Sequence, residues 1–165
     1  MENLKKTKPL KRHPALVPLS KDHHFGLLLC WKIRTGIKRE IAPERIANYV
    51  KYFYADHLTV HFEEEETYIF TLLDEKDEKR KKAEKQHRKI SRLVDKLSSE
   101  PENLTITLGQ IEEEVEAHIR FEERDLFPYI QNTQDEAGLE RLKEKIEEIH
   151  QQTAEVWEDQ FWERN

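Results

Sequence analysis

The sequence predicts an all-α fold, an up-and-down four-helix bundle with an additional C-terminal helix. Glycine and proline are scarce, at four and six of 165 residues, which argues against a turn-rich all-β fold. Apolar residues make up 36% of the chain and charged residues 38%, a balance suited to amphipathic helices with a narrow buried stripe. Apolar residues recurring at every third or fourth position then define the helices one by one.

Start and stop signals divide the chain into three parts. Residues 1–19 hold three prolines and are expected to form an N-terminal arm, with Ser20 as the first helix N-cap. Residues 20–133 are expected to form the bundle, and residues 134–165 a C-terminal helix packed on it. The expected helices cover 20–37, 43–73, a stretch that closes at SSEPEN (98–103), 103–131 and 137–162. Gly36 is expected to end the first helix, and Pro128 to kink or end the fourth.

Charge and composition exclude several classes of protein. The net charge is -6 and the basic runs are short, whereas a nucleic-acid binder more often carries a basic excess. No apolar run approaches the roughly 20 residues of a membrane span, and the single cysteine, Cys30, cannot form an internal disulfide. We therefore expect a soluble cytoplasmic protein with neither nucleic-acid nor membrane partners; the sequence names no protein partner.

Histidines and glutamates occupy core positions of the predicted helices. Steps of three or four residues along each apolar stripe lead to positions where an apolar residue is expected. The polar residues found there are His57, His61, Glu65, His87, His118 and Glu122. A lone inward histidine is more often a hydrogen-bonded core residue than a ligand. Only the occurrence of several such histidines and glutamates on different helices indicates a site.

The first helix offers two adjacent histidines, of which only one can share the buried stripe. The stripe through His23 also contains Leu19, Leu27, Cys30, Ile33 and Ile37. The stripe through His24 contains Ser20, Leu28, Trp31 and Thr35, and is less apolar. We therefore favour His23 as the inward residue and place His24 outward or in a supporting position.

One pattern occurs twice in the chain. HFEEEETYIF from His61 and HIRFEERDLF from His118 both read His-x-x-x-Glu-Glu-x-x-aliphatic-Phe. His-x-x-x-Glu places both side chains on one helix face, with Cβ atoms about 5–6 Å apart. A buried carboxylate costs several kcal/mol unless it is paired or bound to a metal. A metal explains both copies at once, and the remaining acids Glu63, Glu64 and Glu66 are expected to form a solvated face that at most holds ligands.

The predicted ligands combine imidazole with carboxylate and include no thiolate. They are His23, His61, Glu65, His87, His118 and Glu122. This donor set disfavours structural zinc and fits iron or manganese. If both glutamates bridge two metals, the protein fills eight of roughly twelve octahedral positions, and an oxo or hydroxo bridge takes two more. Positions then remain open for a small molecule.

At this point the sequence resembles the hemerythrin-like family, also described as HHE cation-binding domains. The resemblance covers residues 21–130 and rests on DHHFGLLL, HLTVHFEEEETYIF, QHRKI and HIRFEERDLFPYI. The family folds as a four-helix bundle around a non-haem, oxo-bridged di-iron centre that binds dioxygen or related small ligands. The resemblance implies that the six predicted ligands bind two iron ions, with Glu65 and Glu122 as bridges.

The sequence departs from the oxygen-carrying members at two ligand positions. Ser91 stands four residues after His87, where the carriers have a second histidine. The fourth helix has His-x-x-x-Glu, where the carriers have His-x-x-x-x-Asp. In both departures the sequence resembles divergent bacterial members and iron-sensing eukaryotic relatives more than the carriers. His57, one turn before His61, is expected to supply the missing imidazole. The alternative is that Ser91 leaves a position for water or substrate and that His57 only hydrogen-bonds to it.

Three hypotheses follow for the function. The first is a di-iron protein that binds dioxygen, nitric oxide or peroxide for sensing, storage or stress protection, with manganese or a mixed pair as the alternative metal. The second is a di-iron enzyme of the oxidase or peroxidase type. The third is a metal-free helical interaction module.

Overall fold

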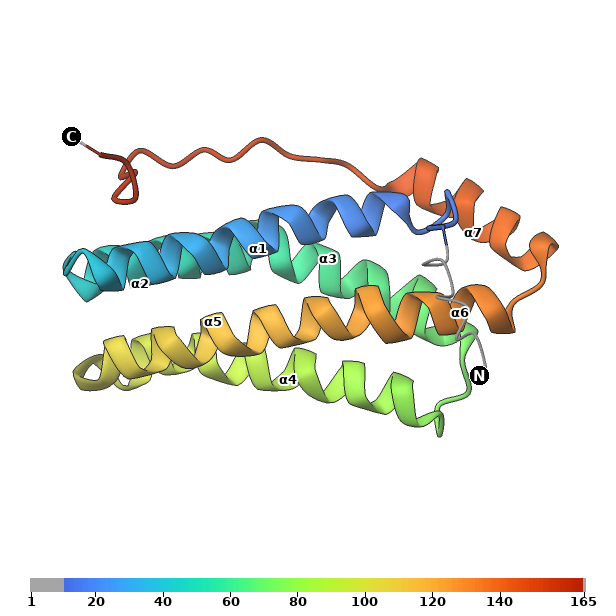
Figure 1. The fold of residues 1–165 in the computed structure, drawn as a ribbon, viewed down its shortest axis with the longest axis horizontal. Coiled ribbons are helices and arrows are strands. Elements are labelled where there is room, and N and C mark those ends of the chain that lie inside the picture. The colour runs from blue at the N-terminus through green and yellow to red at the C-terminus, as the bar shows by residue number, and fades with distance from the viewer. Residues whose placement is uncertain (1–10, 165) are drawn as a thin grey trace, which may run out of the picture.

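Residues 11–164 are described by the computed structural model, and they form a four-helix bundle with a fifth helix and an extended C-terminal segment (Figure 1). The first arm of the bundle is α1 (Val17–Lys38) and the third is α4 (Glu78–Ser99). The second arm joins α2 (Pro43–Phe53), η1 (Tyr54–Leu58), α3 (Thr59–Glu64), η2 (Glu65–Ile69) and η3 (Phe70–Leu72). The fourth arm, after the short turn η4 (Pro101–Asn103), joins α5 (Leu104–Phe121), η5 (Glu122–Leu126) and α6 (Phe127–Thr133). The fifth helix is α7 (Glu136–Ile149), and the predicted all-α architecture is confirmed.

The first helix differs from the prediction at both ends. It begins at Val17, with Pro18 in its first turn, so Ser20 is not its N-cap. The rest of the predicted arm, residues 1–10, lies outside the described residues. Gly36 does not end the helix, which continues to Lys38. A Cβ on Gly36 would lie 2.7 Å from Ile46 Cδ1 and 2.9 Å from Phe161 Cε2. The glycine therefore permits close packing rather than ending the helix.

The C-terminal helix is shorter than predicted, because α7 ends at Ile149 instead of continuing to Trp162. From His150 the chain is extended and returns along α1 and α2 to the opposite end of the bundle (Figure 1). We call residues 150–164 the C-terminal strap. From Thr153 to Phe161 the side chains that contact the bundle are those of alternate residues, namely Thr153, Glu155, Trp157, Asp159 and Phe161. This period of two belongs to an extended chain, in which successive side chains point to opposite sides.

The strap is anchored most firmly at the end of the bundle far from α7. Lys32 is buried and its Nζ donates hydrogen bonds to Tyr49 Oη at 2.9 Å and to Glu155 Oε2 at 3.2 Å. The same Nζ lies 3.9 Å from the centre of the Trp162 ring, a cation–π contact. Phe161 is buried in the core at 3% exposure. These contacts hold the strap to the bundle without a helix.

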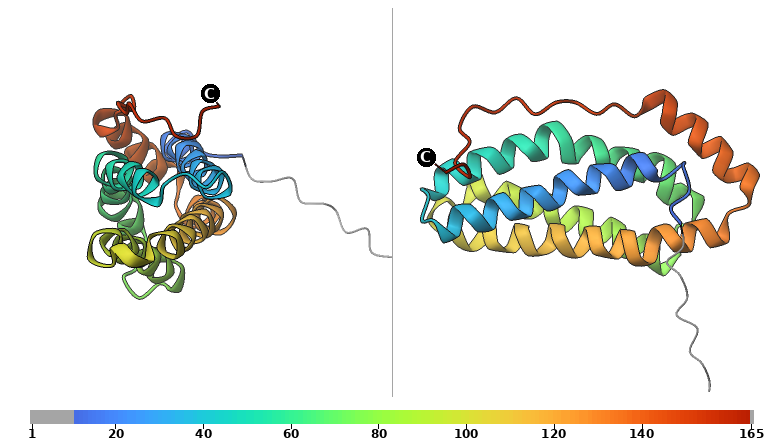
Figure 2. Two further views of the ribbon diagram at one scale, coloured as in Figure 1. Left: turned by 90° about the vertical axis from the view of Figure 1, so that its left-hand side faces the viewer. Right: turned by 45° about the horizontal axis from the view of Figure 1, so that its top comes forward.

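The apolar core is divided into two clusters along the bundle axis. One contains Leu29, Ile33, Val50, Leu108 and Ile111, and the other contains Leu19, Phe70, Leu126, Phe127 and Ile146, each with further neighbours. His87 stacks on Phe62 of the first cluster at 3.8 Å and lies 5.2 Å from Phe70 of the second. The end-on view shows the four arms around this core (Figure 2). A polar layer therefore lies between two apolar layers.

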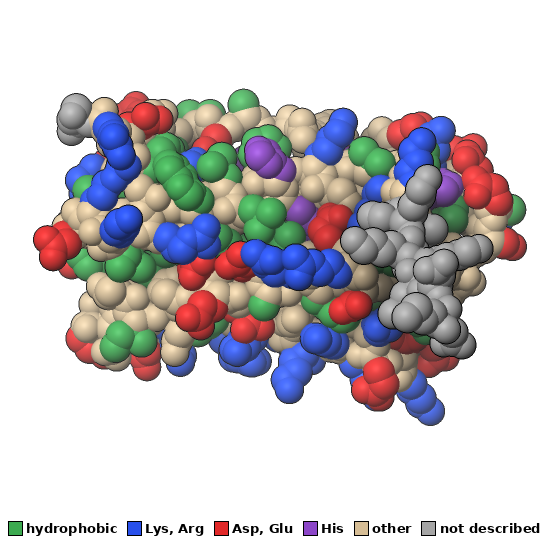
Figure 3. Space-filling model, viewed as in Figure 1, with side chains coloured by type: hydrophobic (Ala, Val, Ile, Leu, Met, Phe, Trp, Pro, Cys, Tyr) green, Lys and Arg blue, Asp and Glu red, His purple; other side chains and the backbone are tan. Residues whose placement is uncertain are grey.

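The surface matches the composition of the chain. Lys, Arg and acidic side chains alternate over the face shown in Figure 3, while hydrophobic and histidine side chains gather near its middle, close to the strap. None of the described helices is long and apolar enough to cross a membrane.

Candidate metal centre

Six side chains from the four arms converge in the polar layer, and they are six of the seven polar core residues that the apolar stripes predict. Each is at most 6% exposed. They form two groups, His23, His61, Glu65 and Glu122, and Glu65, His87, His118 and Glu122. Within each group the potential ligand atoms lie within 4.8 Å of one another. Glu65 and Glu122 belong to both groups, so the cluster has two halves joined by two carboxylates.

The first helix turns His23 into this cluster and leaves His24 exposed, as predicted. Not every residue of the expected stripe faces inward, because Leu27 is 40% exposed. Gly26 and Leu29 are buried in its place. The helix is therefore rotated slightly from the expected orientation, but His23 remains inside.

The repeated motif has a repeated backbone form. In both copies a π-helical segment begins at the shared glutamate, η2 at Glu65 and η5 at Glu122. Such segments widen an α-helix locally and are frequent at functional sites. His61 Nε2 lies 3.1 Å from Glu65 Oε1, and His118 Nε2 lies 2.9 Å from Glu122 Oε1. The second segment also lets the fourth arm continue past Pro128 as α6, so this proline does not end the helix.

Each of the four histidines is held from outside through its Nδ1 atom. Asp22 Oδ2 lies 2.9 Å from His61 Nδ1, and Glu66 Oε1 lies 3.0 Å from His87 Nδ1. The corresponding contacts are Gln86 Oε1 to His118 Nδ1 at 2.7 Å and Glu123 Oε1 to His23 Nδ1 at 2.6 Å. An outer acceptor on one ring nitrogen fixes the tautomer and directs the other nitrogen to a metal.

These outer contacts form a closed ring around the bundle. The first arm supplies Asp22 to the histidine of the second arm, which in turn supplies Glu66 to the third. The third arm supplies Gln86 to the fourth, and the fourth returns Glu123 to the first. Each arm therefore orients the imidazole of the next. The orientation of all four histidines depends on the complete bundle.

The atoms that face inward fit a cation. His87 Nε2 and His118 Nε2 are 3.1 Å apart. When both rings donate their Nδ1 hydrogens outward, these Nε2 atoms carry only lone pairs, and two facing lone pairs repel unless a proton or a metal ion neutralises them. Among residues 11–164, Glu65 Oε2 and Glu122 Oε2 are buried without a hydrogen-bond partner. Metal ions would satisfy these unpartnered atoms.

Without a metal, protons take its place. Burial acts to lower the pKa of His118, but the negative charge of Glu122 and hydrogen bonds to Glu122 and Glu65 outweigh it and raise the pKa to about 9. The pKa of His61 is also raised well above its usual value, because the charge of Glu65 outweighs burial. For Glu65, burial acts to raise the pKa, but the charge of His61 holds it well below its usual range. Cations and protons therefore compete for this cluster.

His57 lies outside both groups. It stands eight residues before Glu65, about 12 Å along the helix axis, so the structure does not bring it together with the other predicted ligands. Its ring packs 5.1 Å from Phe53, and its Nδ1 lies 3.5 Å from Thr153 Oγ1 of the strap.

The sequence-based reasoning missed the outer ring. Asp22, Gln86 and Glu123 were not singled out, and Glu66 was expected mainly on a solvated face. A signal was present, because each stands directly beside a predicted ligand in the sequence. Their partners could not be read from the sequence, because each contacts a ligand on another arm.

Glu64 was also expected on the solvated face, but it is only 8% exposed. Its Oε2 lies 2.7 Å from His150 Nδ1, at the start of the strap. His150 Nε2 lies 3.3 Å from Asp22 Oδ1, and Asp22 also holds His61. The strap is thus joined to the surroundings of the metal centre by a single histidine.

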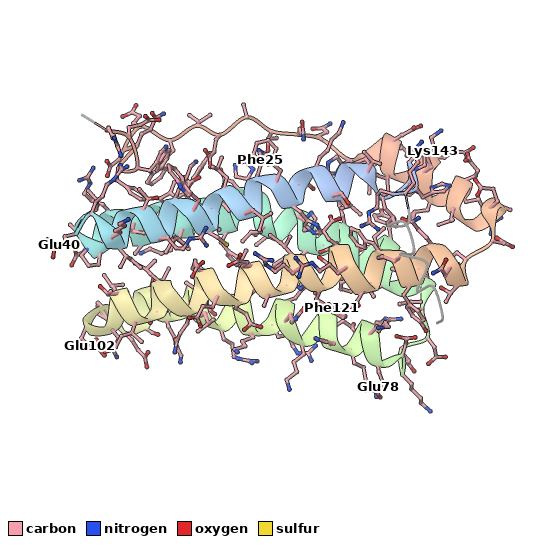
Figure 4. The ribbon with its side chains drawn as sticks, viewed as in Figure 1. Phe25, Glu40, Glu78, Glu102, Phe121 and Lys143 are labelled. Atoms are coloured by element: carbon pink, nitrogen blue, oxygen red, sulfur yellow. The ribbon has the colours of Figure 1, made fainter. Side chains whose placement is uncertain are left out.

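A cavity of about 620 Å³ adjoins the cluster. Its lining includes the predicted ligands His23, His61 and His118 at one end and residues 149–155 of α7 and the strap at the other. Phe25, on the side of α1 near the strap, also lines it (Figure 4). The cavity therefore connects the cluster with the space under the strap.

Fold and site together define a class of protein, a helical bundle with a buried histidine and carboxylate cluster suited to cations. The Hemerythrin family model, described as the hemerythrin HHE cation binding domain, matches residues 81–160. The matched segment contains His87, His118 and Glu122, and the resemblance to the hemerythrin-like family is confirmed. Neither the curated proteins nor the solved structures give a significant match. The family model and the buried clusters indicate metal binding.

Proposed function

We propose that the chain is a non-haem di-iron protein that binds dioxygen, nitric oxide or peroxide for sensing, storage or stress protection. One observation carries this proposal. The two groups of potential ligands each contain two histidines and share the same two glutamates, Glu65 and Glu122. Shared carboxylates are the donors that suit two neighbouring ions, and imidazole with carboxylate oxygen suits iron.

The proposed ligand set leaves coordination positions open. Four histidines and two bridging glutamates fill eight of roughly twelve octahedral positions, and an oxo or hydroxo bridge fills two more. About one position per ion then remains for a small molecule. Manganese or a mixed pair would use the same donors, so the identity of the metal is the first quantity to measure.

The cavity supports access from one side. His23 and His61 line it, whereas His87 does not. A small ligand entering from the cavity would therefore meet the ion held by His23 and His61. The other ion, held by His87 and His118, is deeper with respect to this entrance, although His118 also lines the cavity.

Metal content is the decisive measurement. We expect about two iron ions per chain in protein produced with ample iron, and a loss of most metal in both Glu65→Ala and Glu122→Ala, because each glutamate serves both ions. Glu63→Ala is the matched control, because Glu63 lies in the same acidic run but is exposed. Two retained metals in either glutamate variant would refute the shared site.

Ligand binding is tested on the same preparation. The optical spectrum of the reduced protein should change on exposure to dioxygen or nitric oxide, and the metal-free protein should show no such change. An enzyme of the oxidase or peroxidase type is the second candidate, favoured by the cavity, which is larger than a diatomic ligand requires. Turnover with peroxide and a reductant would identify the enzyme, and reversible binding without turnover would identify the binding protein.

A further inference from the structure

The cavity beside the cluster is much larger than dioxygen, nitric oxide or peroxide needs. Its volume of about 620 Å³ corresponds to about 20 water molecules at roughly 30 Å³ each. Ligand pockets for organic molecules commonly span about 300–1,000 Å³. The size of the cavity therefore fits an organic molecule rather than a diatomic gas.

The walls of the cavity are rich in apolar side chains. Phe25 and Leu28 of α1 line it, together with Val60 of α3, and these three are 47%, 37% and 49% exposed. Phe53 and Ile119 line it deeper in the bundle. Large apolar side chains left this exposed on two facing helices mark a surface that an apolar molecule would cover.

The charged residues of the lining disfavour an anion in the part of the cavity away from the histidine cluster. No lysine or arginine lines the cavity among the described residues, whereas four acidic residues do: Asp22, Asp56, Glu64 and Glu155. Asp22 and Glu64 already contact His150, and Glu155 already pairs with Lys32. Away from the histidine cluster, an organic anion would therefore find acids and no lysine or arginine, while an organic cation would find three of the four acids already occupied.

One polar group in the lining lacks a partner. His57 lines the cavity, and its Nε2 is buried without a hydrogen-bond partner among the described residues. A buried polar atom left unpaired costs about 1–3 kcal/mol. A hydroxyl group can both donate to and accept from an imidazole nitrogen, so it would pair with His57 in either tautomer.

We infer that this cavity binds an uncharged, mid-sized organic molecule with an apolar body and a hydroxyl group that hydrogen-bonds to His57 Nε2. The apolar body lies between α1, α3 and the strap, in the space next to His23 and His61. This inference rests on the proposed function only for the metal ions beside the molecule. It makes the bound molecule a candidate for the substrate of the enzyme alternative.

Three aromatic probes of one shape test the inference with the metal-loaded protein. We expect 2-naphthol to bind, naphthalene to bind more weakly, and 2-naphthoate to bind at least about tenfold more weakly than 2-naphthol, because a carboxylate beside His57 would lie among acidic side chains with no lysine or arginine in the lining. Fluorescence titration measures the three affinities. Metal content is measured in every sample, so a failure of the metal site is separated from a failure of the cavity.

Two variants locate the probe. His57→Leu, which keeps the size but removes the nitrogen, should weaken 2-naphthol by about threefold to tenfold and leave naphthalene unchanged. Val60→Trp should fill the cavity and weaken both probes. Ile106→Trp is the matched control, because Ile106 is 65% exposed on α5 and does not line the cavity.

The results divide into two sets. Binding of 2-naphthol that depends on His57 and Val60, with intact metal content, supports the inference. The inference is overturned if 2-naphthol does not bind, if 2-naphthoate binds equally well, or if His57→Leu has no effect on 2-naphthol.

Discussion

The motif copy at 61–70 and the copy at 118–127 have the same backbone form at the centre of the bundle but different surroundings. Each provides a histidine, a shared glutamate at the start of a π-helical segment, and a second glutamate that holds a histidine on another arm. They differ one residue before the shared glutamate. Glu64 of the first copy binds His150 of the strap, whereas Phe121 of the second copy packs in the core.

This difference shows which part of the site the repeat determines. The ligands and their outer glutamates come from equivalent positions of both copies, so the inner geometry is close to symmetric. The first copy contributes His61, Phe62 and Glu64 to the lining of the cavity, and the second contributes His118 and Ile119 at the positions equivalent to the first two. The repeat therefore supplies four of the six predicted ligands and part of the cavity wall, while the contact with the strap through Glu64 belongs to the first copy alone.

After the shared glutamates, the largest effect should come from removing the histidine of either copy. His61→Ala and His118→Ala each damage one group and leave the other complete, so we expect each to retain about one metal per chain. Metal analysis of both variants, with the exposed His24→Ala as control, measures this. Loss of both metals from one variant and none from the other would show that the two halves are not equivalent.

The pH dependence of the metal-free protein should reveal the raised histidine pKa values. For His118 the folded pKa of about 9 exceeds the usual 6.5, so its contribution to stability is complete below pH 6.5 and is lost as pH rises through 9. The loss is of the order of 3 kcal/mol. Urea unfolding at pH 6.5 and 9.5 measures it. A metal-free protein that is more stable at pH 9.5 would contradict the assignment.

Metal affinity should change in the opposite direction over the same range. Metal binding requires each imidazole to lose its proton, so affinity should rise with pH until the histidines of the metal-free protein are neutral. Competition with a chelator of known affinity at several pH values measures this rise.

Substitution of the outer glutamates Glu66 and Glu123 should have a smaller effect on metal binding. Comparison of the two variants tests whether the two motif copies are equivalent. Glu66→Ala releases His87, and Glu123→Ala releases His23. Loss of such an outer partner costs about tenfold to 100-fold in metal affinity. Gln substitutions keep an acceptor oxygen and should restore part of the affinity. If both Ala variants bind metal as tightly as the control Glu63→Ala, the outer contacts do not orient the ligands.

The smallest effect on the metal centre should come from the contact between Glu64 and the strap, which only the first copy makes. His150→Ala removes the partner of Glu64 and should lower the free energy of unfolding by about 1–3 kcal/mol. It should also speed proteolysis within residues 150–160 while metal content stays unchanged. Glu147→Ala, exposed on α7, is the control. Loss of metal from His150→Ala would mean that the strap also supports the centre.

The burial and clustering of the six predicted ligands could be predicted, because a buried polar or charged group breaks an apolar stripe at a position that the sequence shows. The extended conformation of the strap could not be predicted from the sequence. Trp157 and Phe161 are four residues apart, and this spacing fits both one face of a helix and one side of an extended chain. Contacts distant in sequence, such as Phe161 with Tyr49, decide between the two. His57 was expected beside the other predicted ligands because it shares their helix face, but a shared face does not fix the position along the axis, and His57 lies outside both groups.

The position of the strap after the predicted ligands in the chain has a consequence for biosynthesis. Chains are made from the N-terminus, and their segments fold as they emerge. The last predicted ligand, Glu122, is synthesised before α7, and His150 follows only after α7. Every metal-binding residue is therefore made before the segment that covers the cavity. The order of translation thus gives metal ions a period of access to the open bundle, before the strap completes the wall.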